Sequence, residues 1–360
     1  MDQPAFTVDI AAPAPGGLAR ALRAVGEEVS RDRLLLAIVV AYVAAAGLFC
    51  LLTGRARYYD PFLYMEMWTL GLAAGAVVYA LAWELPKAVR AQPKAPLTNL
   101  LANLRGWMSA RTAASLILFF AAGLFTGVFT SMKSLLNDVV PFTADGWLAQ
   151  VDAWVHFGVD PWRLLQPVLG HETITRGIQK FYLAGWAMLL VGFTASAAFA
   201  PGLAHVRRRF FLTYFAAWIA LGNIVAAAFM SGGPVYYGRL TGDYGRYAEQ
   251  LRYLSFSRGM ESSSYDLQNG LWALYQQHSF QAGTGVSAFP SMHVATMMLF
   301  TLTAFQLDRR LGFVIGALAL TILTGSVHLA WHYAIDGYAS AAFVALVWFG
   351  IGRLEARRAP

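Results

Sequence analysis

Long apolar runs recur along the whole chain and dominate its pattern of hydrophobic and polar positions. Each run holds about 20 predominantly apolar residues, which is the length that an α-helix needs to cross a bilayer. Eight such runs can be read, so the pattern predicts an all-α, polytopic membrane helix bundle. The predicted spans are residues 34–53, 62–84, 112–132, 181–200, 210–231, 288–306, 311–331 and 336–353.

Composition supports a membrane protein. Of the 360 residues, 58% are hydrophobic and 13% are charged, whereas an average soluble protein carries about 25% charged residues. The N-terminal segment is polar and charged, so we expect no cleavable signal peptide. Residues 17–29 fit either a short amphipathic helix on the membrane surface or a frayed tail. Cys50 is the only cysteine, which excludes a disulfide framework and a thiolate metal cluster.

Positive charge predicts the orientation of the spans, because cytoplasmic loops carry an excess of Lys and Arg. When the 27 Lys and Arg residues are sorted onto alternate sides of the eight predicted spans, 17 fall on the side of the N-terminus. We therefore expect a protein of a plasma or inner membrane with both termini cytoplasmic. The two longest outer connections, 133–180 and 232–287, are predicted to form an extracytoplasmic cap. The first contains a run at helical spacing that suits a helix in the interface with its tryptophans at headgroup depth, namely Trp147, Leu148, Val151, Trp154 and Val155.

The string "SAFPSMH" is a polar cluster at the outer end of the sixth predicted span. Proline is favoured at the first helical position, so Pro290 predicts that the helix begins there. The free N–H groups of Ser291, Met292 and His293 would then form an anion site at the positive end of the helix dipole. Ser291 adds a hydroxyl, and His293 can donate a proton near neutral pH. The simpler alternative is a helix start with a snorkelling histidine.

A second cluster, "HLAWHYAIDGY", lies between the seventh and eighth predicted spans. His332 and Asp336 are four residues apart, so on a helical turn the carboxylate can bond one imidazole nitrogen. This bond fixes the tautomer and makes the other nitrogen a better nucleophile or base. Ionisable groups in a membrane are costly and usually functional. Two clusters on one membrane face therefore favour a reactive site, whereas for His328, one turn before His332, a structural role is favoured over a catalytic one.

Together the two clusters resemble the type 2 phosphatidic acid phosphatase superfamily. Its second motif reads roughly Ser-x-Ser-Phe-Pro-Ser-Gly-His, and its third motif ends in His-x-x-x-Asp. The variant with a bulky residue before the histidine, combined with "HYAID", is most similar to the branch that contains fungal inositol phosphorylceramide synthases. The resemblance covers residues 112–353 and implies a six-helix membrane core there. Residues 34–111 then add two spans and a cytoplasmic loop, and residues 1–33 form a cytoplasmic N-terminal segment.

The resemblance implies metal-independent phosphoester transfer through a phosphohistidine, without a cofactor. His332 matches the nucleophile, and Asp336 matches its orienting partner. His293 matches the acid that protonates the leaving oxygen and then the base that activates the acceptor. Ser291 and the neighbouring amides, including that of Met292, match the phosphate cradle. The implied partners are a lipid donor and a lipid or polyol acceptor in the bilayer, and no nucleic acid.

Three departures from the family pattern bear on the substrate. Phosphatase members carry an arginine six residues before the third-motif histidine, where this chain has Ser326, and Met292 replaces a glycine. The first motif, Lys-x6-Arg-Pro, is not found, so Arg239 in "GGPVYYGR" is the candidate phosphate-binding cation. Fewer cations suit a phosphodiester monoanion better than a phosphomonoester dianion.

The sequence therefore favours a membrane phosphotransferase that moves a phospho-alcohol headgroup, such as phosphoinositol, between lipids at the extracytoplasmic face. One alternative is a lipid phosphate phosphatase that uses the same residues with water as acceptor. An alternative from another class is a non-catalytic lipid-binding or transport protein that retains the fold.

Overall fold

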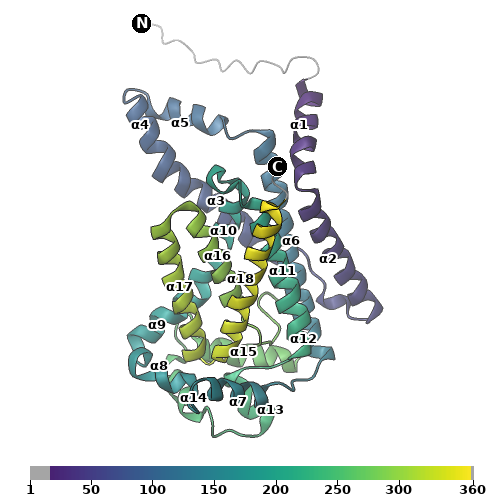
Figure 1. The fold of residues 1–360 in the computed structure, drawn as a ribbon, viewed down its shortest axis with the longest axis vertical. Coiled ribbons are helices and arrows are strands. Elements are labelled where there is room, and N and C mark those ends of the chain that lie inside the picture. The colour runs from purple at the N-terminus through teal and green to yellow at the C-terminus, as the bar shows by residue number, and fades with distance from the viewer. Residues whose placement is uncertain (1–16, 358–360) are drawn as a thin grey trace.

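The computed structural model describes residues 17–357, which form helices joined by loops, with no β-strand in that range (Figure 1). Within this range, seven helices are long and apolar enough to cross a membrane, by length and composition. This confirms the predicted all-α polytopic bundle. The seven are Arg33–Leu52 (α2), Met65–Ala91 (α3 to α4), Ala110–Val139 (α6), Glu172–Phe199 (α9 to α10), Arg207–Ala228 (α11 to α12), Arg309–His328 (α17) and Ala334–Ala356 (α18).

Three of these helices contain a short π-helical segment. The composite helices are α3 (Met65–Tyr79) with η2 (Ala80–Glu84) and α4 (Leu85–Ala91); α9 (Glu172–Lys180) with η3 (Phe181–Gly185) and α10 (Trp186–Phe199); and α11 (Arg207–Ile219) with η5 (Ala220–Val225) and α12 (Ala226–Ala228). Such segments are frequent at functional sites. Two of the three, η3 and η5, line the cavity described below.

The sixth predicted span is a shorter helix, α16 (Met292–Leu307). Pro290 does not begin this helix, contrary to the prediction, because Ser291 is the N-cap and accepts a hydrogen bond from the N–H of Val294. With 16 residues, α16 is about 24 Å long, which is less than the ~30 Å of a bilayer core. Its first residues, Met292 and His293, are partly buried and line the cavity described below.

Helix α6 extends to Val139, beyond the predicted end of that span at residue 132. The hydropathy pattern ends too early because the polar residues of the last two turns face other parts of the protein. Ser134 bonds Thr284, and the side-chain amide of Asn137 bonds the backbone of Val286. Lys133 therefore lies on a helix of the bundle and not in the cap connection.

The N-terminal segment contributes a helix, α1 (Gly17–Arg31), that continues the direction of α2 (Figure 1). It therefore fits the helical alternative for residues 17–29. It packs beside the start of α6 (Ala110–Val139), where Arg111 lies 3.9 Å from Glu28. Between α1 and α2, Asp32 accepts two hydrogen bonds of 2.6 Å from the buried guanidinium of Arg207. This pair fixes the first span to α11. Residues 1–16 lie outside the described range.

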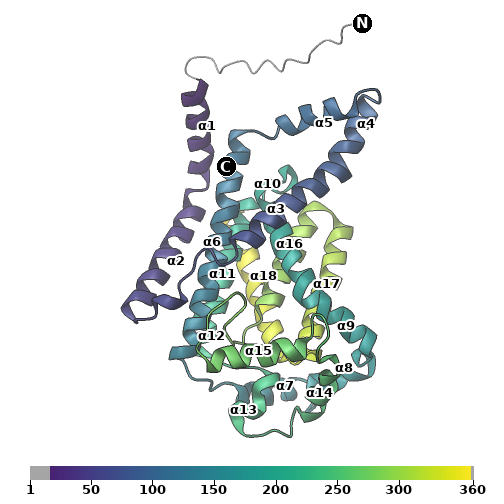
Figure 2. The same ribbon diagram turned by 180° about the vertical axis from the view of Figure 1, so that it is seen from behind.

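The two predicted cap connections fold together at the end of the bundle opposite the described N-terminus (Figures 1 and 2). The exposed face of α7 carries Trp147 and Trp154, which are 42% and 79% exposed, while its other face is buried. Val151 and Val155 share this exposed face, as their spacing predicts, whereas Leu148 is fully buried on the other face, contrary to the prediction. The helices of the cap are α7 (Asp145–Val155), α8 (Pro161–Leu169), α13 (Tyr237–Thr241), α14 (Ala248–Leu254) and α15 (Ser264–Gln276).

Candidate active site

The predicted His332 and Asp336 pair is present. His332 Nδ1 lies 3.1 Å from Asp336 Oδ2, and both side chains are buried. The same carboxylate oxygen accepts the N–H of Tyr333, the N-cap of α18, at 3.1 Å. A carboxylate in this position favours the tautomer protonated at Nδ1, so Nε2 keeps the lone pair that a nucleophile needs. Burial, followed by the nearby Lys133 ammonium, lowers the pKa of His332 to about 3, which keeps the imidazole neutral.

His293 lies between two aromatic rings, an arrangement that the sequence did not indicate. The ring of Tyr182 stacks on its imidazole with centroids 4.3 Å apart, and Trp186 lies 4.0 Å away on a tilted plane. Trp186 is itself fixed by an indole N–H bond of 2.8 Å to Thr296. The two rings hold His293 in one orientation, and their faces would stabilise positive charge on the imidazole when it is protonated.

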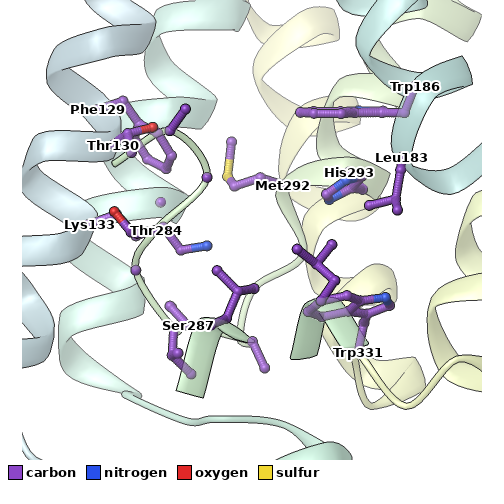
Figure 3. A pocket seen from close by; sticks show the side chains of 18 of the residues that line it. Phe129, Thr130, Lys133, Leu183, Trp186, Thr284, Ser287, Met292, His293 and Trp331 are labelled. Carbon is purple, nitrogen blue, oxygen red and sulfur yellow. The ribbon is translucent and has the colours of Figure 1, made fainter. Parts of the chain in front are cut away.

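A cavity of about 550 Å³ brings His293 and His332 together. Figure 3 shows Trp186 over His293 on one side of it, opposite Phe129, Thr130 and Lys133 on α6. The N–H of Ser291 donates to the main-chain carbonyl of Asp336 at 3.3 Å, which joins the starts of α16 and α18. Two segments far apart in the sequence thus present their histidines to one space.

Lys133 is the cation of this cavity, and the sequence reading missed it. Among the residues that line the cavity, it is the only Lys or Arg. The segment 281–288, which we call the strap, lines the cavity and lies directly against Lys133. A Cβ at Gly285, where φ is +95°, would meet Lys133 Cγ at 2.8 Å, so a glycine is needed there. Lys133 matches no motif in the sequence, so only its contact with the distant strap reveals that it faces the cavity.

Two predicted site residues lie elsewhere. Ser291 is fully buried and does not line the cavity, because its N–H and hydroxyl are engaged in joining α16 to α18 and in capping α16. Ser287, on the strap, lines the cavity instead. Arg239 is exposed outside the cavity, where it donates to Asn269 at 3.1 Å and lies over the ring of Trp272. Met292 does line the cavity, as expected for its place beside His293.

Two buried carboxylates on α7 support the site, and the sequence reading missed them as well. Asp145 accepts the N–H groups of Gly232 and Gly233 and the hydroxyl of Tyr333, each at 2.9 Å. Asp152 accepts the N–H groups of Ala334 and Ile335 at the start of α18. Burial raises the pKa of both carboxyls, and the hydrogen bonds that they accept act in the opposite direction. The cap is thus bonded to the residues that flank His332.

Replacing Asp152 with alanine should destabilise the protein, because two N–H groups at the first turn of α18 lose their acceptor. The expected loss is about 1–2 kcal/mol in the free energy of unfolding, the scale of an N-terminal cap. Thermal unfolding of the purified protein measures it. Glu249→Ala is the matched control, since Glu249 pairs with Arg163 at the surface of the cap and such pairs contribute little. Equal midpoints for the two variants would contradict the capping role.

Replacing Lys133 with methionine should lower kcat/KM about 100-fold, the scale of removing one charged or polar group that stabilises a transition state. Methionine keeps most of the apolar stem, so the strap retains its packing. Lys180→Met is the control, because Lys180 is exposed and pairs with Glu261 at 3.6 Å. Steady-state kinetics on a phospholipid substrate measure both. A Lys133→Met enzyme as active as the control would show that the phosphate does not approach this ammonium.

The chain matches the family model of the PAP2 superfamily over residues 146–350, which is more than half of its length. No curated protein and no solved structure matches it. The matched range contains His293, His332 and Asp336, whereas Lys133 and the first three spans precede it. The chain therefore belongs to the PAP2 superfamily, the superfamily of type 2 phosphatidic acid phosphatases.

Proposed function

We propose that this protein is a membrane phosphotransferase that moves a phospho-alcohol headgroup from a donor lipid to a lipid or polyol acceptor through a phosphohistidine. Membership in the PAP2 superfamily supports lipid phosphatase or phosphotransferase chemistry in general. The observation that carries the finer proposal is one cavity that holds both histidines and a single Lys. The site is proposed to open on the extracytoplasmic side, as the distribution of Lys and Arg predicts.

In the first step, Nε2 of His332 attacks the phosphorus of the donor, and a P–N bond forms as the P–O bond to the leaving alcohol breaks. Protonated His293 gives its proton to the leaving oxygen, so that a neutral alcohol departs. Asp336 stabilises the positive charge that develops on the imidazole of His332. The Lys133 ammonium, with donors of the strap, balances the negative charge on the phosphoryl oxygens.

In the second step, the roles reverse. Neutral His293 takes the proton of an acceptor hydroxyl, and the resulting oxygen attacks phosphorus. The new P–O bond forms as the P–N bond breaks, which restores His332. The product is a phosphodiester when the acceptor is an alcohol, and a phosphomonoester of the headgroup when it is water. The nature of the acceptor therefore decides between a transferase and a hydrolase.

The charge of the site favours a phosphodiester as donor. A phosphomonoester near neutral pH carries up to two negative charges, whereas a phosphodiester carries one. Lys133 is the only Lys or Arg among the cavity-lining residues, and Arg239 lies outside the cavity on Asn269 and Trp272. One ammonium balances one phosphodiester charge, and the one carboxylate among the lining residues, that of Asp266, accepts the Gly259 N–H and supplies no positive charge. This comparison supports transfer of a substituted phosphate over hydrolysis of a monoester.

Product analysis with the purified full-length protein tests the proposal. The donors are phosphatidylinositol labelled with ³²P and, in parallel, labelled phosphatidic acid, each in vesicles that contain ceramide and diacylglycerol as acceptors. A new labelled phosphodiester lipid, absent with His332→Ala, is the expected result. Release of inorganic phosphate from phosphatidic acid, without any new lipid, would overturn the transferase in favour of a phosphatase. Absence of turnover together with normal binding of both lipids would favour the non-catalytic alternative.

A further inference from the structure

We infer that the inner end of the cavity binds a hydrocarbon chain of the lipid substrate, and that Met67 on α3 limits the length of the chain that is accepted. The inference rests on the proposed function, since it concerns the lipid whose phosphate reaches His332. It adds a role for a helix that precedes the family match, which begins at residue 146.

The cavity is polar at one end and apolar at the other. The reactive end holds Lys133, His293 and His332. On α6, Thr126 lies seven residues before Lys133 and also lines the cavity, so the cavity extends about 10 Å along the helix. The inner end is formed by one side chain from each of four helices, namely Met67 of α3, Phe129 of α6, Leu190 of α10 and Trp218 of α11.

The inner end has two polar groups, and neither is available to a ligand. The Trp218 indole N–H has no partner among the described residues, but it is buried and is not exposed to the cavity. The Thr126 hydroxyl donates to the carbonyl of Ala122 at 2.8 Å and lies 3.1 Å from the hydroxyl of Tyr214. Phe129, Leu190 and Trp218 are each at least 95% buried within the protein. A polar headgroup would lose its water there without gaining partners, whereas an alkyl chain loses nothing and gains apolar contact. The reactive end takes the phosphate of the substrate. A lipid, which joins a phosphate to a hydrocarbon chain, therefore has the chemistry that fits both ends of the cavity.

Helix α3 is fixed against this cavity at three levels. The hydroxyl of Tyr64, the N-cap of α3, lies 3.1 Å from Thr130 Oγ1 and accepts the N–H of Gly283 on the strap at 2.8 Å. One turn further, Trp68 packs edge-on against Phe119 with centroids 4.8 Å apart. Deeper still, a Cβ at Gly71 would meet Val191 of α10 at 2.7 Å, so the two helices are in close contact. These contacts hold α3 in position, so Met67 lies in a part of the cavity lining that cannot easily move.

A tryptophan at position 67 should shorten the accepted chain. With Met67→Trp, we expect kcat/KM for a dipalmitoyl donor to fall by ~10-fold or more relative to that for a dioctanoyl donor with the same headgroup. A hydrophobic pocket typically changes kcat/KM by about this factor between substrates that differ by one methylene group. Leu70→Trp is the control on the same helix, because Leu70 is 61% exposed and does not line the cavity. It should leave the ratio of the two donors unchanged. Equal losses for both donors with Met67→Trp would overturn the inference.

Photolabelling tests the same site without turnover. The probe is a phosphatidic acid with a diazirine midway along one acyl chain, added to full-length His332→Ala protein. We expect crosslinks to Met67, Phe129, Leu190 or Trp218, and fewer of them in the Met67→Trp variant. Labelling confined to lipid-facing residues such as Leu70 would overturn the inference. If the wild-type protein shows no turnover but these crosslinks form, the proposed function fails and the chain-binding site stands.

Discussion

Replacing His332 with alanine should reduce headgroup transfer about 10⁴-fold or more, because removal of a nucleophile leaves only the catalysis supplied by binding and charge. The structure gives the physical reason. His332 Nδ1 is engaged with Asp336 at 3.1 Å, and His332 lines the cavity that it shares with His293. Steady-state rates with the labelled phosphatidylinositol donor measure the effect.

The His332→Ala protein must also be shown to fold. Thermal unfolding should give a midpoint near that of the wild type, since the Asp336 carboxylate still accepts the Tyr333 N–H. His171→Ala is the matched control, because His171 is exposed at the start of α9 and makes no side-chain cap bond. A His332→Ala enzyme within about tenfold of this control would exclude His332 as the nucleophile.

Replacing His293 with alanine should lower the rate about 10²- to 10⁴-fold, the usual contribution of a general acid or base. The size of the effect should depend on the leaving group. A p-nitrophenyl phosphodiester has a leaving oxygen that departs without a proton, so formation of the phosphohistidine should then be nearly as fast as in the wild type. Burst kinetics of p-nitrophenol release measure this step separately from the second one.

The comparison with His332→Ala makes this test specific. His332→Ala should lose the burst with every leaving group, whereas His293→Ala should lose it only with an alkyl leaving group. If His293→Ala is equally slow with both leaving groups, His293 serves to shape the cavity between Tyr182 and Trp186 and does not transfer a proton.

The reactive side chains were predictable from sequence because they lie in short local patterns. The spacing of four residues between His332 and Asp336 is enough to place the carboxylate against the imidazole, and the structure has this contact at 3.1 Å. His293 follows the start of an apolar run within two residues of Ser291. The meeting of the two histidines in one cavity followed from the alternation of spans across the membrane, which assigns both helix starts to one face.

The supporting residues were not predictable in the same way, because their roles depend on contacts between distant segments. Lys133 reads as the end of an apolar run, and only the strap from residues 281–288 shows that it faces a cavity. Asp152 contacts the start of α18, which lies 182 residues away in the sequence. The place of Arg239 in the sequence predicts a phosphate-binding role, yet α15 supplies it with partners outside the cavity.

At the start of α16, two residue preferences for a helix N-terminus predict different first residues. Pro290 and Ser291 are both good residues for a helix N-terminus, as first helical residue and as N-cap respectively. The serine takes the N-cap position, and the proline lies before it. The consequence for the site is that the Ser291 N–H bonds the carbonyl of Asp336 and is not free to bind phosphate.

The most direct measurement of the central claim is the identification of the covalent intermediate. The protein is mixed with ³²P-labelled phosphatidylinositol, quenched in alkali within one turnover, digested and analysed by mass spectrometry. A phospho-alcohol group on His332, lost when acceptor is added and absent from His332→Ala, is the result that we predict. Turnover of the donor with no modified His332, or with the label on another residue, would contradict the account.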